Sequence, residues 1–331
     1  MRKRFFATTL ILFAVSELSA HDDWSLNNHW NVAADFVYLK RNGLHGKHIV
    51  YDSNKPASLT DPDDNFSVMS TKRLVRSFEF EPGFRLTASY TKNKKSTVEA
   101  TFMTVHEWEG KRTVCGNHSL SFPFNNPNYT HDFNMADKAK AVYRSKFYNA
   151  ELNYWRHFTP RRGDYFSLSG IIGARYMQLN EKFNLTFYKG DDTSHYRIRT
   201  QDHLYGLQVG LDLMVNPTVC ISWEFVGKVG PALNHSEQHT FLSDDNDMTT
   251  LRKFRKKKFN AVFFADVEGI LTFQWTANVN LHAGYKFMYL NGVVLAPEQI
   301  DKKTSAHSGK RVHDGGVIYI HGLTAGVNFG F

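Results

Sequence analysis

Apolar side chains recur at every second position along much of this chain, and this pattern restricts its fold more than any other feature. In the stretch 316–331, one set of alternate positions is apolar apart from His321, and the other set is mostly small or polar. Because successive side chains of a strand point to opposite faces, this stretch predicts a strand with one apolar face. The same period predicts further strands at 30–39, 73–91, 97–108, 143–155, 165–181, 197–215, 218–230, 259–271 and 276–290.

The segments between these expected strands alternate between long and short. The long ones are 40–72, 109–142, 182–196, 231–258 and 291–315, and the short ones are 92–96, 156–164, 216–217 and 272–275. Outer-membrane barrels have short periplasmic turns and long extracellular loops. We therefore predict an all-β fold, a transmembrane antiparallel up-and-down β-barrel of about ten strands, or of twelve if a long loop contains another hairpin. The alternative is a β-sandwich, in which two apolar faces cover each other.

The N-terminus has the layout of a signal peptide. Arg2, Lys3 and Arg4 precede the apolar segment 5–15, and the small residue Ala20 suits cleavage. We expect residues 1–20 to be a signal peptide and residues 21–331 to form a single outer-membrane β-barrel domain; a buried N-terminal helix is the alternative. The mean hydropathy of −0.43 argues against a helical membrane protein, which needs apolar runs of about 20 residues.

The end of the chain carries a separate signal. Gly326, Phe329 and Phe331 lie in an alternating segment that ends on an aromatic residue. This segment resembles the C-terminal strand that the barrel-assembly machinery recognises in outer-membrane proteins. We therefore expect that machinery to be a partner, in addition to outer-membrane lipid.

Several blocks in the middle of the chain resemble one protein family. The blocks are 82–85, 150–154, 173–181, 203–210 and 227–230, followed by Asn234. Their order and spacing resemble the outer-membrane beta-barrel porin-7 family, although His203 stands where an asparagine is expected and the N-terminal third has no matching block. The resemblance implies a barrel in the outer membrane of a Gram-negative bacterium. The word porin in the family name does not establish transport.

Charged residues on the predicted strands indicate which face is the interior. A charge that faces lipid costs about 2–4 kcal/mol at the midplane, so the charged face must turn inward. The expected lumen-facing charges are Glu79, Glu81, Arg85, Glu99, Glu151, Arg175, Asp212, Glu224, Asp266, Glu268 and Lys286. Barrels of about 8 strands are filled by side chains, so we expect arginine–carboxylate pairs to close most of the lumen. If water does pass, the surplus carboxylates should favour cations.

A second group of charges lies at the base of the fourth long connection. The expected lipopolysaccharide contacts are Arg252, Lys253, Arg255, Lys256, Lys257 and Lys258. Topology places them at the outer rim, where lysine and arginine can form charge-assisted hydrogen bonds with phosphate. A solvated loop without a specific partner is the alternative.

The two cysteines are expected at opposite ends of the barrel, too far apart for a disulfide. Cys115 falls in a long connection and Cys220 near a short one. We therefore expect no intramolecular bridge. Cys115 is either a free thiol or a site of intermolecular contact.

The sequence gives little indication of catalysis. The pairs His118-Ser119 and His307-Ser308 have no third partner in register. We predict a protein that is not an enzyme, binds no cofactor or metal and has no nucleic-acid partner.

Two functions remain open. One is a narrow porin-like channel for small solutes with cation preference, and the other is a non-conducting surface anchor whose loops bind lipopolysaccharide, a partner or a host surface.

Overall fold

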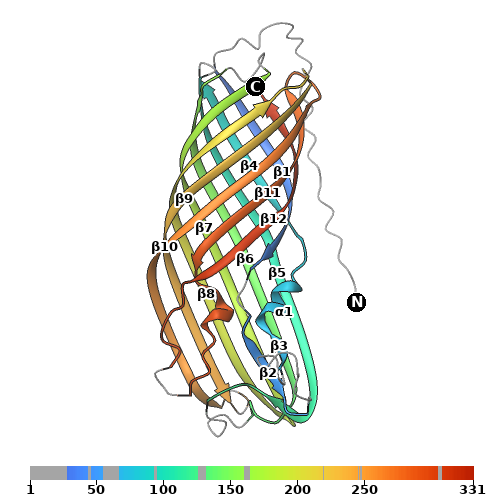
Figure 1. The fold of residues 1–331 in the computed structure, drawn as a ribbon, viewed down its shortest axis with the longest axis vertical. Helices are drawn as coiled ribbons and strands as arrows, with labels where there is room; N and C mark the ends of the chain where they lie inside the picture. Colours follow the sequence, from blue (N-terminus) through green and yellow to red (C-terminus); the bar gives the residue numbers. More distant parts are fainter. Residues whose placement is uncertain are drawn as a thin grey trace, which may run out of the picture.

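The computed structural model describes residues 28–43, 46–54, 67–92, 95–125, 132–159, 165–218, 220–244, 246, 248–304 and 308–331. Ten of the described strands form a closed antiparallel ring (Figure 1). In spatial order they are β1 (Asn28–Asn42), β4 (Glu81–Lys92), β5 (Ser96–Ser121), β6 (Ala136–His157), β7 (Phe166–Lys189), β8 (Asp192–Val215), β9 (Ile221–Asp244), β10 (Thr249–Gln274), β11 (Val279–Val293) and β12 (Gly316–Gly330). Pairing of β12 with β1 closes the ring, which confirms the predicted up-and-down barrel. The predicted signal peptide lies outside the described residues.

The first long connection contains a small hairpin. Its strands are β2 (His48–Asp52) and β3 (Ser67–Ser70), and helix α1 (Thr71–Arg76) follows directly. Tyr51 and Asp52 of β2 pair with the end of β5. The hairpin therefore extends the sheet to twelve strands without entering the ring of ten. Among the described residues, no helix is both long and apolar enough to cross a membrane.

Several segments that we expected to be loops are strands. Strands β7 and β8 continue through most of the predicted loop 182–196 and are joined only by Gly190 and Asp191. Gly190 has a φ of +59°, which glycine adopts without strain. Strands β5, β6, β9 and β10 likewise extend far into 109–142 and 231–258. The expected strand 73–91 was wrong at its start, because residues 71–76 form α1 and β4 begins at Glu81. The other strands that border these long connections extend beyond the expected ranges, because their apolar residues change to the inward face there.

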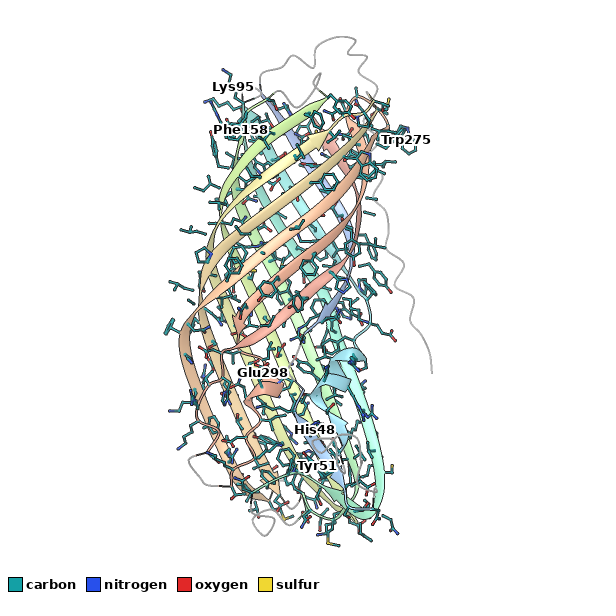
Figure 2. The ribbon with its side chains drawn as sticks, viewed as in Figure 1. His48, Tyr51, Lys95, Phe158, Trp275 and Glu298 are labelled. Atoms are coloured by element: carbon teal, nitrogen blue, oxygen red, sulfur yellow. The ribbon has the colours of Figure 1, made fainter. Side chains whose placement is uncertain are left out.

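One half of the barrel carries a band of exposed apolar side chains, and we call it the banded half. The band is clearest on β8, β9 and β10, where it comprises Tyr205, Leu207, Val209, Leu211, Leu213, Trp223, Phe225, Val229, Leu233, Phe259, Phe263, Val267, Leu271 and Phe273. The banded half ends at the short connections, marked by Lys95, Phe158 and Trp275 at the top of Figure 2. An outward apolar band with aromatic residues near its edges is the lipid-facing surface of a membrane barrel.

The other half, which we call the distal half, has a different construction. Strands β1, β4, β11 and β12 end before it, and β5–β10 continue as a curved wall (Figure 1). The open side of the wall is filled by β2, β3, α1 and the segment around the short helix η3 (Ala296–Gln299). Buried core residues of the distal half include Leu74, Phe78, Trp108, Tyr143, Phe183, Phe187, Tyr196 and Leu295. Burial of each such side chain stabilises the fold by about 1.5–3 kcal/mol. The distal half therefore has its apolar side chains inside, as a water-soluble protein does.

Candidate functional site

The banded half encloses a cavity of about 930 Å³ that is lined by both charged and apolar side chains. Its lining includes Tyr165, Asn216, Thr218 and Gln274, which lie at the short connections. The cavity therefore reaches the end of the barrel that an outer-membrane orientation places in the periplasm. We call it the vestibule.

Buried ion pairs line the vestibule, and Arg85 of β4 joins strands on two sides of it. Its Nε donates to Asp35 of β1 at 2.5 Å, and its Nη1 lies 2.6 Å from Glu268 of β10. His282 of β11 contacts the other oxygen of Asp35. These residues come from strands that are far apart in the sequence, so the ion pairs cross-link the barrel wall.

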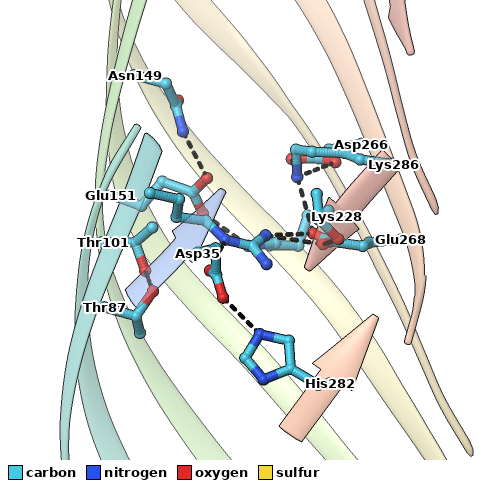
Figure 3. A network of polar contacts seen from close by, with 12 residues as sticks. Asp35, Thr87, Thr101, Asn149, Glu151, Lys228, Asp266, Glu268, His282 and Lys286 are labelled. Atoms are coloured by element: carbon cyan, nitrogen blue, oxygen red, sulfur yellow. Dashed lines mark hydrogen bonds and ion pairs between the residues drawn. The ribbon is translucent and has the colours of Figure 1, made fainter. Parts of the chain in front are cut away.

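A second cluster surrounds Arg175 of β7, whose side chain is fully buried. Its Nη2 lies 2.6 Å from Glu151 and 2.5 Å from Asp266. Lys286 reaches Asp266 at 2.8 Å, and Lys228 reaches Glu151 at 2.7 Å (Figure 3). Because both carboxylates have two cationic partners, the cost of burying these charges is offset by pairing.

The structure brings most of the expected lumen charges together. Residues in or beside the two clusters are Arg85, Glu99, Glu151, Arg175, Asp266, Glu268 and Lys286, and Glu224 lines the vestibule with them. Asp212 is fully buried on β8. Glu79 and Glu81 do not join the clusters: Glu79 is exposed, and the charges near Glu81 are His106, Glu79 and Glu109. Glu79 precedes β4 and Glu81 is its first residue, whereas β4 pairs with β5 only from Gly83 onward.

Three charged or titratable residues of the clusters were missed from the sequence: Asp35, Lys228 and His282. Lys228 has the same strand parity as Glu224, and this parity could have revealed its inward direction. The added charges of Asp35 and Lys228 cancel, so the excess of lumen carboxylates is smaller than the sequence suggested because Glu79 and Glu81 do not join the clusters.

The vestibule does not continue through the distal half in the part of the chain that the structure describes. Phe264 lies against the Arg175 guanidinium, 5.1 Å from ring centroid to Cζ, and Met177 and Leu204 are fully buried in the same region. Beyond them the distal core fills the interior. Among the described residues, charge pairs and an apolar core together close the lumen.

Two carboxylates of the barrel wall hold the chain at the start of η3. The amide of Ala296 donates to Glu181 of β7 at 2.8 Å, and the amide of Val294 donates to Asp202 of β8 at 3.2 Å. Glu181 also forms a buried ion pair with Arg41 of β1 at 2.7 Å and accepts a hydrogen bond from Tyr143 at 2.7 Å. We call residues 293–300 the plug segment because they cross the interior to these strands.

The expected lipopolysaccharide contacts divide between the two faces of β10. Arg252 points inward, is 4% exposed and donates to Ser308 at 2.5 Å, so it is not available to lipid. Lys253 and Lys256 are exposed. Arg255 and Lys257 form ion pairs with Glu237, and Lys258 with Asp314 at 2.8 Å.

The C-terminal strand lies in the wall with Phe329 and Phe331 exposed. The main chain of Phe331 forms two hydrogen bonds with Trp30, of 2.8 and 2.9 Å. A Cβ at Gly326 would lie 2.0 Å from an Asp35 oxygen, so glycine is needed where the ion-pair cluster meets β12. Recognition by the assembly machinery stays a prediction.

Cys115 and Cys220 are both exposed free thiols. Cys115 lies in the distal part of β5, and Cys220 lines the vestibule at a short connection.

The described residues contain no group of three or more histidine, cysteine, aspartate or glutamate residues placed to hold a metal ion. His118 is exposed and contacts Asp137 at 3.0 Å, and His307 lies outside the described residues.

Comparison with known proteins supports the fold. No family model matches this chain, and no curated protein sequence matches it. The chain is similar to the outer-membrane protease OmpT of Escherichia coli, with a TM-score of 0.51 and 11% identity over 92% of this chain and 98% of that one. Lower scores relate it to Ail of Yersinia pestis (TM-score 0.28, 9% identity, 92% and 100% covered) and to the translocator domain of NalP from Neisseria meningitidis (0.35, 11%, 91% and 88%). The fold is that of an outer-membrane β-barrel, whereas the porin-7 family stays a prediction.

Proposed function

We propose that this protein resides in the outer membrane as a non-conducting barrel that presents its distal half for binding at the cell surface. The observation that carries this proposal is the filled interior of the distal half. An ion path requires continuous water, and the buried side chains of Trp108, Phe183 and Phe187 occupy the space that such a path would need. The likeness to OmpT rests on the fold alone, so it carries no argument for proteolysis.

Hydrogen bonds between the hairpin ends also support a binding role. Ser194 of β8 contacts Asp244 of β9 and donates to Asp132 of the β5–β6 connection at 3.4 Å. Asn246 accepts a hydrogen bond from the Thr193 amide at 2.9 Å. These contacts join neighbouring hairpins into one surface. A surface that is already ordered loses less conformational entropy when it binds a partner.

The competing function is the narrow porin-like channel with cation preference. The vestibule supports it in part, because Glu99, Glu224 and neighbouring carboxylates line this cavity of about 930 Å³, which reaches one end of the barrel. Conduction would also require the plug segment and the distal core to move aside. The channel is therefore the second candidate function of this protein.

Conductance in planar bilayers separates the two functions. We expect the wild-type barrel to show no steps, because the distal core seals it. A variant with residues 294–300 replaced by a glycine–serine segment of equal length loses the contacts to Glu181 and Asp202 and also removes Leu295, Ala296 and Ile300 from the distal core. The core that seals the barrel is then incomplete, and small, cation-selective openings should appear. The matched control replaces residues 301–304 of the same connection and should stay silent. Cation-selective steps from the wild-type protein, weakened by Glu151→Gln or Glu268→Gln, would establish the channel instead.

A further inference from the structure

A small cavity lined by charged residues lies where β11 ends and β12 begins. It has a volume of about 300 Å³ and is lined by Lys47, Lys258, Glu298, Arg311, Val312, His313, Asp314 and Gly315. We call it the lateral notch. Figure 1 places η3 directly beyond the ends of β11 and β12, and Glu298 is labelled at the same level in Figure 2.

The notch lies at the outer edge of the apolar band. On β10 the exposed apolar series ends at Phe259, which is 76% exposed, and the next outward position is Lys257. Lys258, between them, reaches into the notch. On β12, Tyr319 belongs to the exposed apolar surface, and the notch residues 311–315 immediately precede this strand. Both strands therefore place the notch where hydrocarbon gives way to lipid headgroups.

Positive charge exceeds negative charge in the notch. Lys47, Lys258 and Arg311 face two acids, Glu298 and Asp314. The Nζ of Lys47 is fixed by hydrogen bonds to the carbonyl oxygens of Glu298 and Ile300, at 2.6 and 3.1 Å. Lys258 pairs with Asp314 at 2.8 Å, and Arg311 is exposed.

The pKa of one notch residue reflects this excess. The pKa of His313 is lowered first by burial and then by the nearby charges of Lys47 and Arg311. A bound anion would reduce this repulsion between cations.

We propose that the lateral notch binds a phosphate group of an outer-leaflet glycolipid such as lipopolysaccharide. Arg311 supplies a planar guanidinium that can hold a phosphate by two parallel hydrogen bonds, and Lys47 and Lys258 supply point charges on either side. The phosphate is attached to lipid, because the notch lies at the level of the headgroups and shares no lining residue with the vestibule. Basic residues at this depth are those that bind anionic headgroups.

The first test compares the notch with other cations of the same strand. The notch variant carries Lys258→Gln and Arg311→Gln. The control carries Lys253→Gln and Lys256→Gln, which remove the same charge from exposed positions of β10. The probe is purified lipopolysaccharide added to the delipidated full-length barrel in detergent, and the measurement is occupancy by native mass spectrometry. We expect affinity to fall about 30-fold in the notch variant and to be retained in the control.

Two results would overturn the notch as the site: equal losses in both variants, or no loss in either. Heat-modifiable migration on a gel shows whether each variant is folded. Arg311→Gln alone provides a second variant, because this exposed side chain can be changed without breaking the pair between Lys258 and Asp314.

A second test identifies the source of the phosphate. We expect enzymatically dephosphorylated lipopolysaccharide to bind the wild-type protein as weakly as intact lipopolysaccharide binds the notch variant. Inorganic phosphate should not displace the intact glycolipid. Displacement by inorganic phosphate would assign the notch to a free anion and would overturn the lipid proposal. Conductance of the wild-type barrel would contradict the proposed function and leave this binding result unaffected.

Discussion

Strand β7 passes through both halves of the barrel without a register shift, yet its apolar residues change sides on the way. In the banded half, Phe166, Leu168 and Ile172 point outward and are exposed. In the distal half, Phe183 and Phe187 point inward and are fully buried. The change occurs between Tyr176 and Met177, so one continuous hydrogen-bonded strand carries two opposite polarity patterns.

The comparison shows that the surrounding medium, not the strand itself, determines which face is apolar. In the banded half the outside is hydrocarbon and the inside holds paired charges around Arg85 and Arg175. In the distal half the outside is polar and the inside is an apolar core. The level at which the pattern inverts is therefore the outer boundary of the membrane in the proposed orientation.

The largest expected effect is the loss of a core side chain from the distal half. Phe183→Ala should lower the free energy of unfolding by about 3–5 kcal/mol, because it leaves a cavity in a closely packed interior. Denaturant unfolding of the barrel in lipid vesicles measures the change. Asn184→Ala is the matched control: its side chain faces the other way, and the expected change is within about 0.5 kcal/mol. If both variants behave alike, the distal half has no cooperative core and the comparison is wrong.

The next effect tests the outward face. Val209 lies at the middle of the band on β8 and is 56% exposed. Val209→Arg should destabilise the inserted barrel by about 2–4 kcal/mol, because the charge meets hydrocarbon. Gln201→Arg adds the same charge to the same face of the same strand, in the distal half, and should have almost no effect. Folding yield into vesicles and urea titrations distinguish them. Equal effects at both positions would move the membrane boundary away from Tyr176.

The inversion also explains which parts of the fold could be predicted. Where hydrocarbon lies outside, outward apolar positions such as those of the banded half of β7 reveal a strand and its direction. The ten-stranded ring followed from them. In the distal half, polar outward residues such as Lys182 and Asn184 alternate with an inward apolar series of the opposite parity. A prediction that assumes one constant apolar face does not follow a strand beyond the point where its apolar residues change sides. The distal parts of these strands were therefore predicted as loops.

The ion-pair clusters were predictable in composition but not in partnership. The positions of Glu151, Arg175 and Asp266 along their strands predict that they point inward. A buried charge is costly unless an opposite charge lies nearby, so ion pairs among them could be expected. Which residues meet depends on how the ring closes: Arg85 and Glu268 are 183 residues apart in the sequence. The plug segment was not predictable, because its contacts with Glu181 and Asp202 involve backbone amides that carry no sequence signal.

The smallest expected effect concerns a chain of hydrogen bonds in the wall of the vestibule. The Thr97 hydroxyl is 2.8 Å from the Thr91 hydroxyl and 2.8 Å from Nε2 of His157, and the Nδ1 of His157 is 2.9 Å from Ser169. Thr97→Val keeps the volume of the side chain but removes both of its hydroxyl contacts.

Thr97→Val should therefore lower the free energy of unfolding by about 1–2 kcal/mol, since hydroxyl and imidazole groups that are buried each lose a partner. The matched control is Thr87→Val, whose hydroxyl contacts Thr101 at 3.2 Å. Thr87 is more accessible than the buried Thr97, so water can replace its lost partner and the substitution should cost less. Both are measured in the same vesicle unfolding experiment as Phe183→Ala. Because water can replace a lost partner only where it has access, a larger loss for Thr87→Val would mean that the vestibule is dry. The contrast between a wet interior in the banded half and a dry one in the distal half would then fail.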